Sequence, residues 1–171
     1  MGERRTAAVV TASDGVSTGH REDASGRAVA DLLVEHGWVV ERREVVPDDR
    51  ARIAALLAAL ADEDGLALVC VTGGTGFGPR DVTPEATRDV CHREAPGLAE
   101  AMRAAGRTST PMADLSRGVC GIRRSTLIVD LPGSPRGATE SLAAIVGLLH
   151  HATDLLAGDT EHRAGTPSLD A

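Results

Sequence analysis

Two kinds of hydrophobic pattern alternate along this chain, and the first consists of short apolar runs. Runs that continue without alternation are typical of strands buried on both faces of a sheet. The second run is interrupted by charges at 41–44, which favours a position near a sheet edge. The predicted strands span 6–13, 38–46, 66–72, 119–123 and 126–131, with a turn near Arg124-Ser125 between the last two.

The second pattern is the helical repeat. In the segment after residue 49 the apolar residues recur at i, i+3, i+4 and i+7, as an amphipathic helix requires: Ile53, Leu56, Leu57 and Leu60. The predicted helices span 25–36, the segment from Asp48 or Asp49 onward, 84–107 with a break near 96–97, 111–117, and a long stretch from the rigid turn at 132–135 to about 156.

Capping residues mark several helix starts. Ser25 is the predicted N-cap of the first helix, and Gly37 is its predicted stop. Either Asp48 or Asp49 caps the next helix. Thr83 precedes Pro84, which is favoured at the first helical position, so Thr83 is the predicted N-cap there.

The order of these elements predicts an α/β fold. Strands and helices alternate three times and are followed by two strands and a helix, which implies a mainly parallel sheet with helices on both faces. We expect one domain over 1–158 and a disordered polar tail over 159–171. Ligands bind such sheets at the carboxyl ends of the strands, so the loops after residues 13, 46, 72 and 131 are expected to share one rim.

Composition narrows the function. The 171 residues are 42% hydrophobic but only 1% aromatic, so several stacked aromatic rings for single-stranded nucleic acid are absent. The formal net charge of −7 argues against general binding to nucleic acid or to a membrane surface, but not against a small anionic ligand. Three scattered cysteines without a Cys-x-x-Cys motif indicate a cytoplasmic protein, and the start of the chain shows no secretion signal or membrane span.

The segment 72–85 is the most informative one. It joins a predicted strand to a predicted helix through four glycines, and such a loop can present backbone N–H groups to an anion. A Walker A loop is excluded because Gly78 is followed by Pro79-Arg80, and the dinucleotide fingerprint fails because its third glycine would fall at Pro79. The alternative is a tight glycine turn without a ligand.

Acidic residues are frequent along the predicted rim. Asp14, Asp23, Asp48 and Asp81 all fall in its loops, where helix capping or simple solvation is the alternative for each. The forked guanidinium of Arg80 is suited to bind phosphate through two N–H groups, and Asp81 beside it is a candidate magnesium ligand. These residues therefore predict a phosphate carried with Mg²⁺.

The motifs together resemble those of the MogA/MoaB family, which includes molybdopterin adenylyltransferases. The glycine loop followed by Arg80-Asp81-x-Thr83-Pro84-Glu85 is the most specific match. Nearly the whole chain takes part, through Ser13-Asp14-Gly15, Asp23-x-Ser25-Gly26, Val46-Pro47-Asp48, Leu115-Ser116-Arg117, Leu131-Pro132-Gly133-x-Pro135 and Glu140.

This resemblance implies a three-layer α/β/α fold, often trimeric, with a hexamer as the larger option. It implies transfer of AMP from Mg-ATP to the terminal phosphate of molybdopterin, with contact to a molybdenum insertase afterwards. A catalytically silent molybdopterin binder is the alternative. An anionic phosphate nucleophile needs no strong general base, so alignment and charge neutralisation should supply the catalysis.

The resemblance also implies roles for individual residues. Asp48 and Asp81 are expected to position Mg²⁺ and the α-phosphate. The expected cradle for ATP is Thr72, Gly73, Gly74, Thr75, Gly76 and Arg80. The expected lining of the nucleotide and pterin pockets is Ser13, Asp14, Ser25, Gly26, Ser116, Arg117, Pro132, Gly133, Ser134, Pro135 and Glu140.

Because both substrates are polyanions, a local positive island is expected at the rim of this acidic chain. Its predicted members are Arg80, Arg117, Arg123 and Arg136, helped by the helix N-termini after residues 83 and 135. We also expect apolar surface to be covered by self-association, with trimers as the predicted assembly.

Overall fold

The computed structural model describes residues 5–159. The predicted disordered tail, apart from Asp159, lies outside the described residues. The six-stranded sheet has the order β2-β1-β3-β6-β5-β4, and its strands are β1 (Thr6–Ala12), β2 (Val39–Val46), β3 (Leu68–Thr72), β4 (Arg93–Glu94), β5 (Cys120–Arg123) and β6 (Thr126–Leu131). Strands β1, β2, β3 and β6 pair in parallel, while β5 is antiparallel to both its neighbours, β4 and β6. The mainly parallel sheet and the edge position of β2 are therefore confirmed.

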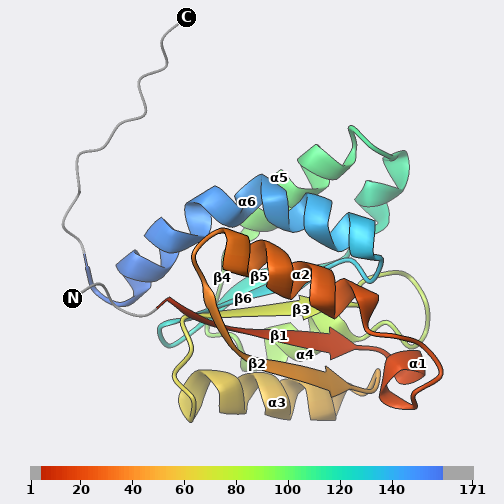
Figure 1. Ribbon diagram of the computed structural model, residues 1–171, viewed down its shortest axis with the longest axis horizontal. Coiled ribbons are helices and arrows are strands. Elements are labelled where there is room, and N and C mark those ends of the chain that lie inside the picture. The colour runs from red at the N-terminus through yellow and green to blue at the C-terminus, as the bar shows by residue number, and fades with distance from the viewer. Residues whose placement is uncertain (1–4, 160–171) are drawn as a thin grey trace, which may run out of the picture.

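Helices cover both faces of this sheet (Figure 1). On one face lie α2 (Ala24–Glu35), α5 (Pro96–Gly106) and α6 (Pro135–Leu156). On the other lie α3 (Arg50–Asp62) and α4 (Thr83–Val90). Each face has its own aliphatic core, and the larger one, between α6, α5, α2 and the sheet, also holds Trp38. The three-layer α/β/α prediction is confirmed.

Several predicted element boundaries were wrong. The segment predicted as a loop after residue 13 begins with the one-turn helix α1 (Asp14–Ser17). The break inside 84–107 contains the short strand β4, and the predicted helix near 111–117 is a 3₁₀ helix, η1 (Pro111–Leu115). These differences arise because one turn of helix or two residues of strand leave no periodicity to read.

The structure also corrects two predicted caps. Asp23, not Ser25, caps α2, since its carboxylate accepts from the Gly26 N–H. Thr83 lies inside α4, whose N-cap is Val82 without a side-chain hydrogen bond. The choice between Asp48 and Asp49 is settled in favour of Asp49, which accepts from the N–H of Arg52 at 2.9 Å.

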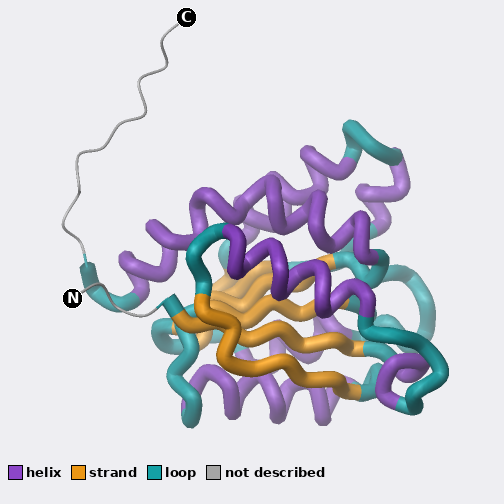
Figure 2. The backbone as a smooth tube through the Cα atoms, in the orientation of Figure 1, coloured by secondary structure: helices purple, strands orange, loops and turns teal. Residues whose placement is uncertain are grey.

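The carboxyl ends of the parallel strands meet at one end of the molecule. Ala12 lies opposite Val46 and Thr11 opposite Thr72, while Thr72 in turn lies opposite Leu131. The four loops that follow these strands gather at that end (Figure 2). The prediction of a shared rim is confirmed, and every feature of the site below follows from it. Among the described residues, no helix combines the length and the apolar character needed to cross a bilayer.

Candidate functional site

A cavity of about 510 Å³ opens at this rim. Nine of the residues predicted from the sequence line it: Gly74, Thr75, Gly76, Asp81, Ser116, Pro132, Gly133, Ser134 and Glu140. Apolar residues of α5, η1 and the tip of the glycine loop also line the cavity: Phe77, Ala99, Met102, Met112, Ala113 and Leu115. A lining that combines polar and apolar residues suits a flat heterocycle that carries phosphate.

The glycine loop is shaped to receive an anion. Gly73 and Gly74 have φ values of 100° and 65°, in the left-handed region that favours glycine. Among the described residues, the backbone N–H groups of Gly74, Thr75 and Gly76 have no hydrogen-bond acceptor. Successive unpaired N–H groups in such a turn form a concave anion site.

Arg117 holds this loop in place. Its Nε donates to Gly76 O at 2.7 Å and its Nη2 donates to Asp81 O at 2.6 Å, while its own backbone N–H donates to Thr75 O at 2.9 Å. Glu85 accepts from the same guanidinium, which lowers the pKa of Glu85. Arg117 was predicted to contact phosphate. In the structure its guanidinium instead donates to the two ends of the loop and to Glu85.

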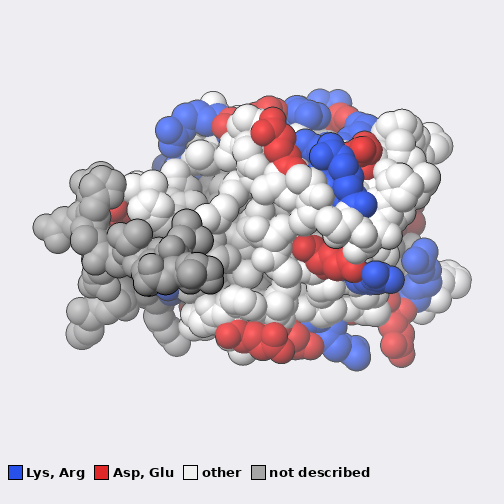
Figure 3. Space-filling model, turned by 90° about the horizontal axis from the view of Figure 1, so that it is seen from above, with Lys and Arg blue, Asp and Glu red and all other residues white. Residues whose placement is uncertain are grey.

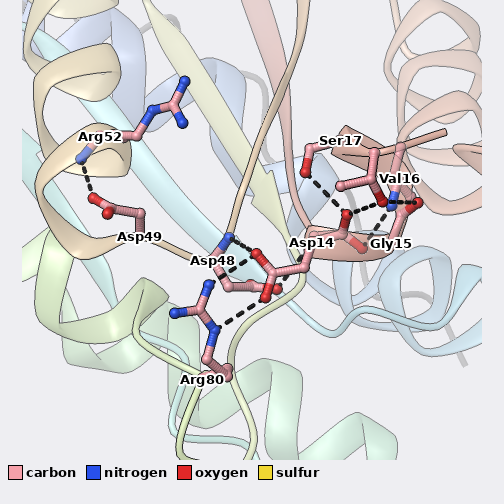
Figure 4. A network of polar contacts seen from close by, with 10 residues as sticks. Asp14, Gly15, Val16, Ser17, Asp48, Asp49, Arg52 and Arg80 are labelled. Carbon is pink, nitrogen blue, oxygen red and sulfur yellow. Dashed lines mark hydrogen bonds and ion pairs between the residues drawn. The ribbon is translucent and has the colours of Figure 1, made fainter. Parts of the chain in front are cut away.

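Three charged side chains form a network beside the loop (Figure 4). Arg80 donates from two nitrogens to the Asp14 carboxylate, at 2.9 and 3.0 Å. The backbone N–H of Asp14 donates to Asp48 Oδ2 at 2.9 Å, and the backbone N–H of Asp48 donates to Asp14 Oδ1 at 3.1 Å. The reciprocal bonds tie the loop after β1 to the loop after β2.

The two linked aspartates differ in acidity. Hydrogen bonding to Arg80 holds the pKa of Asp14 below its usual range. Burial raises the pKa of Asp48, and the nearby charges of Asp14 and Asp81 raise it further. Because Asp49 supplies the helix cap, Asp48 is free of that task, and its Oδ1 accepts no hydrogen bond from the described residues.

Asp81 lies under the tip of the glycine loop. Its Oδ2 accepts from the N–H of Gly78 at 2.8 Å. The same oxygen would lie 2.8 Å from a Cβ on Gly76, so a side chain there would displace the Asp81 carboxylate. Gly76 does not have a positive φ, so its backbone conformation does not itself require glycine.

The remaining predicted residues support the rim from outside the cavity. Ser13 caps α1, and Thr72 donates to Pro132 O at 2.7 Å, which joins the ends of β3 and β6. Ser25 and Gly26 lie in the first turn of α2, beside Asp23. Gly73 contacts Ala12 O so closely that no side chain fits, and Pro135 begins α6. These residues build the rim, but they do not line the cavity.

The predicted positive island is wrong for one of its members, Arg123. Each of its four arginines pairs with a carboxylate: Arg80 with Asp14, Arg117 with Glu85, Arg123 with Asp62 and Arg136 with Glu140. Arg123 lies opposite Thr126, the first residue of β6, and therefore at the far end of the sheet. On the face seen in Figure 3, acidic and basic side chains are interspersed.

Some N–H donors at the two helix N-termini are already occupied. At the start of α4 the Thr83 N–H already donates to Gly74 O and Pro84 has no N–H. At the start of α6 the Gly137 N–H donates to Ser134 Oγ.

Two important residues were missed from the sequence. Arg103 on α5 is the cationic residue in the cavity lining. Its Nη1 donates to the carbonyls of Ser116 and Gly118, and within the described residues it has no carboxylate partner.

Asp130 on β6 also lines the cavity although only 1% of its surface is exposed. Burial raises the pKa of Asp130 to about 7. An acid inside the apolar run 126–131 was the available signal for Asp130, whereas Arg103 on an ordinary amphipathic helix offered none.

Residues 8–151 match the family described as a probable molybdopterin binding domain. Over 153 residues the chain is 40% identical to the molybdopterin adenylyltransferase of Helicobacter pylori, covering 88% of this chain and 87% of that protein. It is also 40% identical over 153 residues to a molybdenum cofactor biosynthesis bifunctional protein of Synechococcus elongatus, covering 89% of this chain but 47% of that protein.

The fold agrees with a solved structure. The crystal structure of the molybdopterin biosynthesis enzyme MoaB from Thermus thermophilus superposes with a TM-score of 0.85 at 48% identity, covering 90% of this chain and 96% of that one.

Proposed function

The chain belongs to the molybdopterin binding domain family, and from this membership we propose that it is a molybdopterin adenylyltransferase of molybdenum cofactor biosynthesis. The resemblance to the MogA/MoaB family read from the motifs is confirmed. One structural observation carries the proposal. The glycine-loop residues with unpaired N–H groups line a heterocycle-sized cavity and lie beside Asp48 and Asp81.

The reaction transfers an adenylyl group between two anions. An oxygen of the molybdopterin phosphate forms a bond to the α-phosphorus of ATP, and the bond from that phosphorus to the bridging oxygen of the β-phosphate breaks, releasing pyrophosphate. The nucleophile is already ionised at neutral pH, so the residues need only align the two phosphates and offset their repulsion.

Each part of the site has a place in this scheme. The N–H groups of Gly74, Thr75 and Gly76 bind phosphate oxygens of ATP. Arg103 supplies positive charge to a phosphate inside the cavity, since the other nearby arginines are neutralised by acids. The apolar wall of α5 and η1 receives a flat ring system and excludes water.

Mg²⁺ fits this site as a partner of ATP. In the part of the chain that the structure describes, no three side chains form a metal cage. Mg²⁺ is commonly bound by one or two carboxylates together with substrate phosphates, and Asp48 and Asp81 are the matching donors. When bound, the ion offsets phosphate charge and polarises the phosphoryl oxygens.

Assembly and location belong to the same proposal. Large apolar side chains remain exposed, including Val34, Val45 and Leu148, and we propose that a homotrimer or a hexamer covers such surface. The bifunctional relative joins a similar domain to further sequence, which supports contact with an insertase. Free cysteines suit the cytoplasm.

The direct test is incubation with Mg-ATP and molybdopterin, followed by mass detection of the adenylylated product and of pyrophosphate. The proposal expects both products, and it expects Asp81→Ala to lose at least tenfold in rate while remaining folded. A protein that gains thermal stability with molybdopterin but releases no pyrophosphate would be the silent binder instead.

A further inference from the structure

Among the described threonines, Thr83 is the one whose hydroxyl oxygen is both fully buried and without a hydrogen bond. The hydroxyls of Thr11, Thr72, Thr87 and Thr126 each donate a hydrogen bond at 2.6 to 2.8 Å. Thr83 has no exposed surface, and its Oγ1 has no hydrogen-bond partner among residues 5–159. A buried hydroxyl without a partner destabilises a fold, so its presence at the edge of the site calls for a reason.

The hydroxyl points toward the same place as a free oxygen of Asp48. A Cβ on Gly74 would collide with Thr83 Oγ1 and would lie 3.2 Å from Asp48 Oδ1. The two oxygens therefore border one point above Gly74, which lacks the atom that would separate them. Asp48 Oδ2 is held by the Asp14 N–H, while Oδ1 accepts no hydrogen bond from the described residues.

The backbone fixes the hydroxyl at that point. The N–H of Thr83 donates to Gly74 O at 3.1 Å, which ties the start of α4 to the glycine loop. Pro84 follows and restricts the preceding backbone. The carboxylate is the softer partner, because rotation about the last side-chain bond of aspartate has a broad energy minimum.

We propose that Thr83 is a positioning residue for Asp48, donating a hydrogen bond to Oδ1 when substrate occupies the site. This inference rests on the proposed adenylyl transfer. The hydrogen bond forms fully only as the phosphates reach the transition state, where the hydroxyl fixes the orientation of the Asp48 carboxylate. The hydroxyl is thus unpaired in the free protein and paired in the reacting complex, so it favours turnover at the expense of stability.

The test separates stability from turnover. Thr83→Val has nearly the same shape and removes only the hydroxyl, so it should unfold at the same or a higher temperature than wild type. Its kcat should fall about tenfold or more, the range of a hydrogen bond to a charged group. The KM values for ATP and molybdopterin should stay within about twofold, because the change acts on alignment. Thr83→Ser should restore most of kcat.

Two controls make the result specific. Thr126→Val removes a satisfied hydroxyl at the far end of the sheet, so it should lower stability and leave kcat unchanged. In an Asp48→Ala background, Thr83→Val should add less than a twofold further loss, since its partner is gone.

Wild-type kcat in Thr83→Val would overturn the inference, and so would an undiminished loss in the Asp48→Ala background. If Thr83→Val does not fold, Thr83→Ala takes its place in the same comparisons. Failure of wild type to form the adenylylated product overturns the proposed function itself and this inference with it, and is seen before any variant is compared.

Discussion

Replacing the buried Asp130 with asparagine should stabilise the protein, and the gain should grow with pH. Asp130 Oδ1 accepts from the Thr87 hydroxyl at 2.7 Å, and Oδ2 accepts from the Val119 N–H at 3.1 Å. In the described residues no arginine bonds to this carboxylate. Asparagine keeps both contacts, because its oxygen can accept from Val119 while its amide donates to the Thr87 hydroxyl, which can rotate to accept.

The sign and size follow from the two protonation states. Burial raises the folded-state pKa of Asp130 to about 7, whereas an unfolded aspartate has a pKa of about 3.9. Between those values the folded chain holds a proton that the unfolded chain has lost, so wild-type stability falls as pH rises through this window. The difference between the two pKa values corresponds to a loss of at most about 4 kcal/mol of wild-type stability. We therefore expect Asp130→Asn to be about 1 to 4 kcal/mol more stable than wild type at pH 8.

The assay is chemical denaturation of both proteins at pH 4, 5, 6, 7 and 8. The unfolding free energy of Asp130→Asn minus that of wild type should be small at pH 4, rise through pH 5–7 and level off above pH 7. Asp62→Asn is the control of opposite sign, because hydrogen bonding to Arg123 lowers the pKa of Asp62 and its loss should destabilise most at neutral pH. A difference for Asp130→Asn that is constant with pH, or negative at pH 8, would refute the reasoning.

Three further predictions concern the site. Asp48→Ala should abolish most adenylyl transfer with little loss of stability. Asp49→Ala should lose about 1 kcal/mol of stability, because Asp49 is a helix cap, and should keep its rate. The reverse pattern in paired kinetic and unfolding measurements would exchange the roles of the two residues. Gly76→Val should weaken ATP binding about tenfold or more, because its Cβ would meet the carboxylate under the loop, and unchanged affinity in calorimetry would place the nucleotide elsewhere. The wild-type KM should rise with salt concentration. Arg103→Met should raise KM and weaken its dependence on salt, whereas the surface control Arg42→Met should do neither. A wild-type KM that does not change with salt would contradict the role of Arg103.

Much of the architecture could be read from the sequence. The apolar runs gave the strands of the parallel core, and the long final helix ends where its periodicity ends, at Leu156. The glycine loop and the strand order through β3 were enough to place Asp14, Asp48 and Asp81 at one rim. These features are local or follow from general rules of α/β topology, so no side-chain packing had to be known.

Side-chain partners were harder to infer. Arg80 and Arg117 were predicted as phosphate contacts, yet the fold pairs them with Asp14 and Glu85. Which carboxylate meets which guanidinium depends on loops 32 to 66 residues apart in sequence. Composition gives the number of charges, but only their positions in space decide which of them cancel.

The sequence by itself determined the elements, the mainly parallel sheet and the rim where ligand chemistry gathers, because hydrophobic period and turn chemistry act within a few residues. Only the tertiary structure decided that Arg103 lines the cavity, that Asp130 is buried, and that the Thr83 hydroxyl lies near Asp48 with no partner in residues 5–159. Those properties arise where helices and loops distant in sequence pack together, and the free energy of a charge or a hydroxyl there depends on burial and partners rather than on its neighbours along the chain.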